Sequence, residues 1–151
     1  MLIILLFCSM AEAEILDFEF LDASGKTFKT TKLLTQLEQR DNYRYENMNV
    51  LLIETPSLND QNYLKQEKIL DSMDHGGWEQ LSLMQVTSCW TEEYKHGYHT
   101  SMKTAESLAG KNKMFRVTLI DEDGKVYFRN NNPISLEMLI KVITENKRIK
   151  S

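Results

Sequence analysis

The strongest constraint on the fold is a near-continuous apolar run, NVLLIE, at Asn49–Glu54. The run has the length of a strand, and the lack of polar alternation is typical of a strand that is covered on both faces. Beyond Pro56 the apolar residues adopt helical spacing, at Tyr63, Leu64, Leu70 and Met73. A buried strand followed by an amphipathic helix is a building unit of α/β folds.

Strand-like and helix-like segments alternate along the chain. Strands are expected at Glu14–Leu21, Asn49–Glu54, Leu81–Thr87, Met114–Ile120 and Lys125–Arg129. Helices are expected at Lys32–Arg40, from Ser57 to His75-Gly76-Gly77, at Met102–Ala109 and from Ser135 onward. The tight turn Asp121–Gly124 joins the last two strands, which should therefore form an antiparallel hairpin.

The order β-α-β-α-β-α-β-β-α predicts crossover connections and a mostly parallel sheet. It is the order of the thioredoxin fold, although order alone leaves other α/β sandwiches open. We therefore expect a thioredoxin-like, three-layer α/β sandwich. Its central mixed sheet should have about five strands and end in a C-terminal β-hairpin and a helix.

Size and charge narrow the possible partners. The chain of 151 residues is long enough for one domain with a real core. Its formal charge is −4, and it has no basic run longer than Lys147-Arg148. We therefore expect neither nucleic acid nor an anionic membrane surface as a partner.

The N-terminus has features of an export signal. An apolar run from Leu2 to Phe7 leads to Ala11-Glu12-Ala13, the small-x-small pattern of a cleavage site, and the run is too short to span a membrane. We expect a signal peptide at residues 1–13 and a thioredoxin-like domain at residues 14–151. The protein would then be secreted or periplasmic, with no stable membrane insertion after cleavage. A buried N-terminal strand is the alternative. A lipid anchor at Cys8 is less favoured, because Phe7 is too large for the usual lipoprotein site.

The part of the chain from Tyr43 onward carries several distinctive segments. They are Tyr43-Arg44-Tyr45-x-Asn47, LLIETPS at Leu51–Ser57, the helical piece Gln66–Leu70, RVTLIDEDGKVYFR at Arg116–Arg129 and PISLEMLIKVI at Pro133–Ile143. With these segments the chain resembles a secreted, peroxiredoxin-like domain of unknown function. That domain occurs in many bacteria and at the C-termini of animal sushi-repeat and coiled-coil-domain matrix proteins. The resemblance implies a thioredoxin-like fold without the active-site cysteine pair. Residues 76–113 match poorly, and their arrangement is left open.

The turn after the buried strand is where this fold would carry redox chemistry. A redox site there needs a thiolate at a helix N-terminus, where the helix dipole and free N–H groups lower the pKa of a thiol. Ser57 stands at roughly that position, and a hydroxyl cannot exchange disulfides. We expect Ser57 to cap the helix rather than to act as a nucleophile. Binding of a small anion near Thr55, Ser57 and Asn59 is a further hypothesis, which the charge of Asp60 disfavours.

Cys89 is the remaining candidate for thiol chemistry. Loss of residues 1–13 would leave it as a single cysteine, which cannot form an intrachain disulfide. As a peroxidatic or exchange thiol it would need an external thiol to complete a turnover. Glu92 and Glu93 lie nearby, and negative charge disfavours a thiolate. We favour an ordinary thiol at a strand end.

Three weaker patterns complete the candidate sites. Cys89, His96 and His99 form a C-x6-H-x2-H spacing that lacks a fourth zinc ligand, so a polar loop is the favoured interpretation. The aromatic residues of the same loop would either form a binding surface or cover the edge of the core; they are Trp90, Tyr94 and Tyr98. Arg116 and Arg129, on adjacent strands of the expected hairpin, could grip an anionic partner or be solvated strand charges.

These observations favour a non-catalytic interaction module of an exported protein, which binds a protein partner that the sequence does not identify. No CxxC motif is present, no cofactor is expected, and enzymatic activity is disfavoured. The alternatives are a one-cysteine thiol peroxidase or oxidoreductase that uses Cys89, and a small-anion binding protein that uses the helix end at Ser57.

Overall fold

The computed structural model describes residues 14–150. Its strands are β1 (Glu19–Leu21), β2 (Thr27–Lys29), β3 (Asn49–Thr55), β4 (Leu83–Cys89), β5 (Arg116–Ile120) and β6 (Val126–Asn130). Its helices are α2 (Leu33–Asp41), α3 (Gln61–Asp71), α4 (His75–Leu81), α5 (Met102–Ala109) and α6 (Leu136–Lys150), with a 3-10 turn, η1 (Thr30–Lys32), before α2. Within residues 14–150, no helix combines the length and the apolar character needed to cross a bilayer. The expected signal peptide at residues 1–13, with Cys8, lies outside the described residues.

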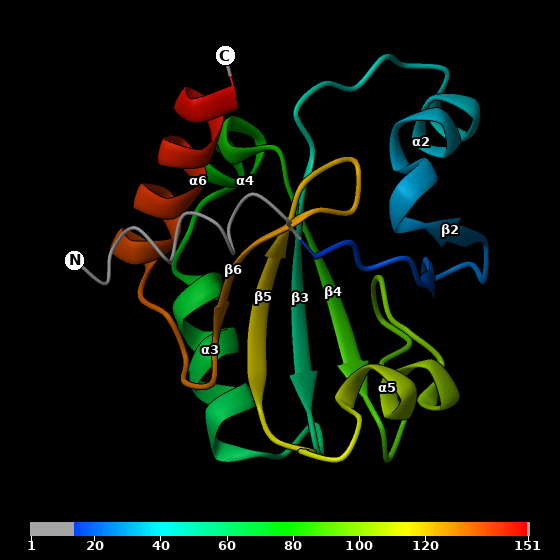
Figure 1. The fold of residues 1–151 in the computed structure, drawn as a ribbon, viewed down its shortest axis with the longest axis vertical. Helices are drawn as coiled ribbons and strands as arrows, with labels where there is room; N and C mark the ends of the chain where they lie inside the picture. Colours follow the sequence, from blue (N-terminus) through cyan, green and yellow to red (C-terminus); the bar gives the residue numbers. More distant parts are fainter. Residues whose placement is uncertain (1–13, 151) are drawn as a thin grey trace.

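The central sheet is mixed, with the strand order β4-β3-β5-β6 (Figure 1). β3 runs parallel to β4 and antiparallel to β5, and β6 returns antiparallel to β5 as the expected hairpin. A final helix, α6, follows this hairpin. The α/β class predicted from the sequence is confirmed.

The sheet differs from the expected one in strand count and direction. Four strands rather than five form the central sheet, and β3–β4 is its one parallel pair in the described chain. The expected strand Glu14–Leu21 is reduced to β1, which pairs with the unpredicted β2 in a separate hairpin. β2 was not predicted because its three residues, TFK, are too few to show the alternation of apolar and polar residues that is typical of a strand. The hairpin joins the edge of β4 through the single residue His99, which bridges to Leu21 and to Thr87.

β3 is buried along its whole length, because helices cover both faces of the sheet. Val50 and Leu52 face one core, which contains Phe20 of β1, Phe28 of β2 and residues of α2. Leu51 and Ile53 face a second core, formed with α3 and α6. The result is three layers, with α3, α4 and α6 on one side, and α2, α5 and the β1–β2 hairpin on the other (Figure 1).

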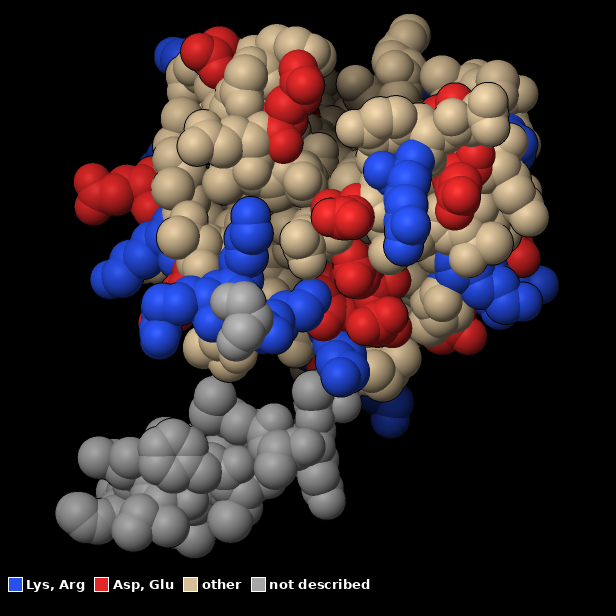
Figure 2. Space-filling view, turned by 90° about the horizontal axis from the view of Figure 1, so that it is seen from above, with Lys and Arg blue, Asp and Glu red and all other residues tan. Residues whose placement is uncertain are grey.

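Charged side chains of both signs lie on one face of the molecule. Figure 2 shows a group of Lys and Arg side chains at the lower left of this face and a group of Asp and Glu side chains beside it, near the middle.

The start of α3 corrects the capping expectation. Asp60, not Ser57, is the N-cap, and its Oδ2 accepts hydrogen bonds from the backbone N–H groups of Asn62 and Tyr63 at 3.0 and 3.1 Å. Ser57 lies one turn earlier, where its Oγ accepts from the Asn59 N–H at 3.2 Å. Asp60 is the cap because its carboxylate, directly before the first helical residue, reaches the free backbone N–H groups of the first turn.

The end of α3 also differs from the expectation. Instead of ending at His75-Gly76-Gly77, the helix ends at Asp71, and these residues open a new helix, α4, capped by Asp74. The Asp74 Oδ1 accepts from the Gly77 N–H at 2.8 Å. The glycines therefore lie in a first helical turn, because a capping Asp immediately before them outweighs their usual preference for helix ends.

The capping assignment predicts unequal effects of two substitutions. Asp60→Ala removes the acceptor for two backbone N–H groups at the start of α3 and should lower the free energy of unfolding by about 1 kcal/mol. Ser57→Ala removes one bond within a turn, and its effect should be only a few tenths of a kcal/mol. Urea unfolding followed by circular dichroism measures both. A larger loss in Ser57→Ala than in Asp60→Ala would contradict the assignment.

Candidate functional site

Cys89 lies at the carboxyl end of β4, directly opposite Thr55 in the parallel register. Its side chain is 1% exposed, and its Sγ lies 3.4 Å from Thr91 Oγ1. The Thr91 hydroxyl in turn donates to the Pro56 carbonyl at 2.7 Å. The thiol is therefore beside the turn that carries Ser57, but it is covered by the chain.

The residues proposed for anion binding are engaged in local hydrogen bonds. The Thr55 hydroxyl donates to the Ser57 carbonyl at 2.9 Å, and the Ser57 hydroxyl accepts from Asn59. Glu92 adds a carboxylate, which accepts from the Leu58 N–H at 3.3 Å. An anion at this helix end would meet the carboxylates of Asp60 and Glu92, which already use the N–H donors.

Both arginines proposed as an anion grip are paired with carboxylates. Arg116 makes a forked contact with Glu54, with Nε–Oε1 at 2.9 Å and Nη2–Oε2 at 3.3 Å, and Glu54 is 1% exposed. Arg129 makes a similar fork with Glu14 at 2.6 and 3.1 Å. The hydrogen bonds that Arg129 donates to Glu14 lower the pKa of Glu14, and the same bonds raise the pKa of Arg129. The guanidinium groups thus serve to neutralise nearby carboxylates.

The histidines of the loop do not converge on Cys89. His99 is buried, and its Nδ1 lies 2.9 Å from the Gly97 carbonyl oxygen. The His96 ring packs edge-on against Tyr94. In the described part of the chain, no three side chains of His, Cys, Asp or Glu are grouped so that they could hold a metal ion.

The aromatic loop divides between the two roles considered for it. Tyr98 packs edge-on against Phe20 and Phe28, and its hydroxyl accepts a hydrogen bond from Arg40 Nη1 at 3.0 Å. Tyr98 therefore covers an edge of the core. Tyr94 extends from the loop toward α3 and lines a hollow, together with one side of Tyr98.

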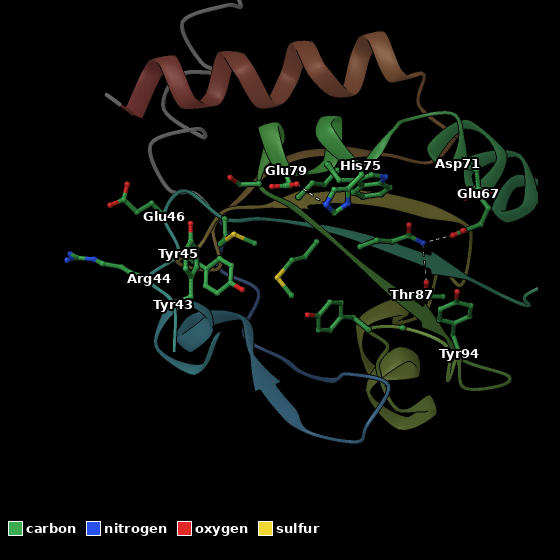
Figure 3. Close-up of a pocket in the computed structure, with 18 residues that line it drawn as sticks. Tyr43, Arg44, Tyr45, Glu46, Glu67, Asp71, His75, Glu79, Thr87 and Tyr94 are labelled. Atoms are coloured by element: carbon green, nitrogen blue, oxygen red, sulfur yellow. Dashed lines mark hydrogen bonds and ion pairs between the residues drawn. The ribbon is translucent and has the colours of Figure 1, made fainter. Parts of the chain in front are cut away.

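This hollow, which we call the β4 groove, follows the outer edge of β4 and has a volume of about 1180 Å³. Figure 3 shows Tyr43, Tyr45 and Glu46 at one end, and Glu67, Asp71 and Tyr94 at the other. His75 and Glu79 of α4 lie between the ends, and the floor is formed by β4. Aromatic and acidic side chains dominate its lining; these are Tyr43, Tyr45, Trp78, Tyr94, Tyr98, Glu46, Glu67, Asp71 and Glu79.

One wall of the groove is fixed by a charged hydrogen-bond cluster. Arg40 donates to both oxygens of Asp41, and the Tyr45 hydroxyl donates to Asp41 Oδ2 at 2.5 Å. The bonds from Arg40 and then Tyr45 lower the pKa of Asp41 to about 2. This cluster holds the Tyr45 ring in place, and the ring of Tyr43 packs edge-on against it.

Glu67 is a half-buried carboxyl group at one end of the groove. Burial raises its pKa, and hydrogen bonds from Gln85 and Tyr63 offset this in part. Its carboxylate accepts from Gln85 Nε2, and the negative charge of Asp71, one helical turn away, raises the pKa further. Burial, followed by the charges of Glu67 and Asp71, also raises the pKa of Tyr94. The end of the groove is therefore a partly desolvated, negatively charged cluster.

The groove was not predicted from the sequence, apart from the possible role of Tyr94 and Tyr98. Its residues come from a loop, two helices and a strand that are distant in the chain. One local signal was present, because Glu67 and Asp71 are like charges at i and i+4 on the face that also carries Tyr63. Such a pair is unfavourable in a helix and is therefore informative.

The mixed sheet with helices on both faces is a thioredoxin-like fold. The chain is similar to peroxidoxin BcpB from Mycobacterium tuberculosis, with a TM-score of 0.60 and 15% identity over 92% of this chain and 97% of that one. The exposed lipoprotein thioredoxin Etrx1 from Streptococcus pneumoniae is similar with a TM-score of 0.56 and 16% identity, over 86% of this chain and 99% of that one. For the reduced 2-Cys peroxiredoxin of Plasmodium vivax the TM-score is 0.51 and the identity 17%, over 92% of this chain and 96% of that one. At these identities the likeness establishes the fold alone.

Within this fold class the chain belongs to a family described as a domain of unknown function, DUF4174, which matches residues 41–146. The resemblance to a thioredoxin-fold domain of unknown function is thus confirmed. No curated protein matches the chain.

The raised pKa of Glu67 predicts how its charge affects stability. Between the unfolded and folded pKa values the folded chain binds more protons, so this group's contribution to stability decreases as pH rises through that range. Glu67→Gln removes the effect. The free energy of unfolding of Glu67→Gln minus that of the wild type should therefore be larger at pH 8 than at pH 4.

Urea unfolding at the two pH values measures this difference. Glu38→Gln, at an exposed position of α2, controls for the loss of one negative charge. A stability difference for Glu67→Gln that shrinks as pH rises would contradict the assignment.

Proposed function

We propose that this protein is a non-catalytic, thioredoxin-like interaction module. The observation that carries the proposal is the state of the thiol. Cys89 is 1% exposed, and it lies beneath the contact between Thr91 and Pro56. Ser57, which is half-buried, occupies the turn instead, and within residues 14–150 no carboxylate or imidazole bonds to its hydroxyl to activate it. A thiol must reach its substrate as an exposed thiolate to act on it, and this arrangement opposes that.

The surface of the molecule supports a binding role. The β4 groove, of about 1180 Å³, is larger than a hollow of about 490 Å³ between α4 and α6, and its aromatic lining is of the kind that anchors protein partners. It is on the outer edge of the sheet, whereas Cys89 and Ser57 are at the carboxyl end of the strands and do not line it. Binding in the groove would therefore be independent of thiol chemistry.

A one-cysteine peroxidase remains the second candidate, for one specific reason. Cys89 and Thr55 are opposite each other at the end of the sheet that carries the Ser57 turn. The similar structures include a peroxidoxin and a peroxiredoxin by name. If the Thr91 contact opened, the sulfur would meet solvent beside that turn.

Activity assays separate the two candidates. Because the Cys89 thiol is covered, the purified chain supplied with dithiothreitol should consume peroxide and reduce insulin no faster than a protein-free blank. The matched control is Cys89→Ser, which should give the same rates. Turnover that disappears in Cys89→Ser would overturn the proposal and establish a thiol enzyme.

We also propose that the protein is exported and that residues 1–13 are removed. The apolar run and the Ala11-Glu12-Ala13 motif support this. Edman sequencing of the mature chain from cells should then begin at Glu14. Replacing Ala11 and Ala13 by Lys should block processing, because the signal peptidase accepts small residues at these positions. A mature protein that retains residues 1–13 in the extracytoplasmic fraction would contradict cleavage at this site.

A further inference from the structure

The outer edge of β4 carries backbone groups that face the β4 groove. At the inner edge, the Asn49 N–H donates to the Ser82 carbonyl at 2.8 Å, which sets the even-numbered residues of β4 to bond with β3. The odd-numbered residues therefore point their backbone groups outward. Thr87 follows this rule, because its N–H donates to Tyr98 and its carbonyl accepts from Thr100.

The same alternation exposes the backbone of Leu83 and Gln85 to the groove. Within residues 14–150, no backbone or side-chain group of the chain makes a hydrogen bond to their outward N–H and C=O groups. The two residues are two positions apart, about 7 Å along the strand, which is the repeat at which an added strand would bond. At the opposite edge of the sheet, β6 is partly covered, because Val126 donates to Glu14 at 2.9 Å.

The side chains around this edge have a clear charge preference. Glu67 and Asp71 lie at one end of the groove, Glu79 in its middle and Glu46 at the other end, against one arginine, Arg44. The Nε2 atom of His75 lies 2.8 Å from Oε1 of Glu79, so this imidazole is already paired with a carboxylate of the groove. A partly buried carboxylate such as Glu67 gains most from a cation that replaces the water it has lost.

We propose that the β4 groove binds an extended segment of a partner protein, which adds as a strand to the outer edge of β4. The segment carries a Lys or Arg side chain that reaches Glu67 and Asp71, and its alternate apolar side chains rest on the groove aromatics. This inference rests on the proposed function, for which it specifies the chemistry of the partner.

The groove discriminates against other occupants. A second copy of this chain, paired edge to edge through β4, would set one acidic groove against another, and like-charge repulsion between their carboxylates opposes this pairing; the groove carboxylates are Glu46, Glu67, Asp71 and Glu79. A small organic cation would fill only part of about 1180 Å³ and would leave the outward backbone groups of Leu83 and Gln85 without a strand partner. An extended peptide satisfies both the charge and the backbone.

A random peptide library displayed on phage and panned against the full chain tests the proposal. The selected peptides should share one basic residue with apolar residues at alternating positions around it. A synthetic copy of a selected peptide should bind Glu67→Gln about tenfold more weakly than the wild type, because the pairing with the carboxylate is lost. Glu137→Gln, an exposed position on α6, is the matched control and should bind as the wild type does.

Backbone pairing is tested separately, so that a purely electrostatic contact is distinguished from strand addition. Methylation of alternate peptide amides should abolish binding in one register and spare it in the other. Amide hydrogen exchange followed by NMR should slow at Leu83 and Gln85 when the peptide is added. Failure to select any peptides, equal affinity for Glu67→Gln, or protection at other residues would each overturn the proposal. Peptide-independent dimerisation in sedimentation, if Glu67→Gln changed it, would identify a second copy as the occupant and overturn it too.

The same peptide measured on Cys89→Ser keeps the two proposals apart. Binding that persists in Cys89→Ser, together with thiol turnover by the wild type, would remove only the non-catalytic assignment. No turnover and no peptide binding would remove only the strand-addition proposal.

Discussion

Both edges and both faces of β3 are satisfied within the protein, and this arrangement determines the rest of the structure. Its hydrogen bonds go to β4 on one side and β5 on the other, and its side chains alternate between two cores. A strand enclosed in this way cannot shift register without moving apolar groups to the wrong face. It therefore fixes where the turn at Thr55–Ser57 emerges, where α3 begins, and which edge of β4 is left facing outward.

The parts of the fold that depend on long periodic segments could be predicted from the sequence. Each of these parts has a hydrophobic pattern that extends over several strand residues or more than one helical turn. They are the run at Asn49–Glu54, the hairpin around Asp121–Gly124 and the amphipathic α6. The parts that failed are those decided by a single side chain or by tertiary pairing. Asp60 and Asp74 set two helix starts by capping, and β1 and β2 exist because they pair with each other and, through His99, with β4.

The candidate residues at the turn could be identified, whereas the groove could not. Cys89 and Ser57 were identified by residue type alone, and the structure adds that the thiol is buried beside the turn. Glu67, Gln85 and Tyr45 have no shared motif, since they line one groove only because α3, β4 and the loop beyond α2 pack together. A groove built from separate elements leaves a signal in sequence only where a local rule is broken, as with the like charges of Glu67 and Asp71.

The bridge made by His99 has a consequence for the geometry of the sheet edge. His99 bonds to Leu21 of the β1–β2 hairpin, and its neighbours Tyr98 and Thr100 bond to the outward C=O and N–H side of Thr87, so this loop segment is a stop at the end of the open edge. The same loop segment therefore limits the length of edge available to another chain and links the backbone of the hairpin to β4. A rearrangement of the loop at 90–100 that released His99 would lengthen the edge toward Cys89 and break the backbone link between the hairpin and β4, while Phe20 and Phe28 stayed packed in the core.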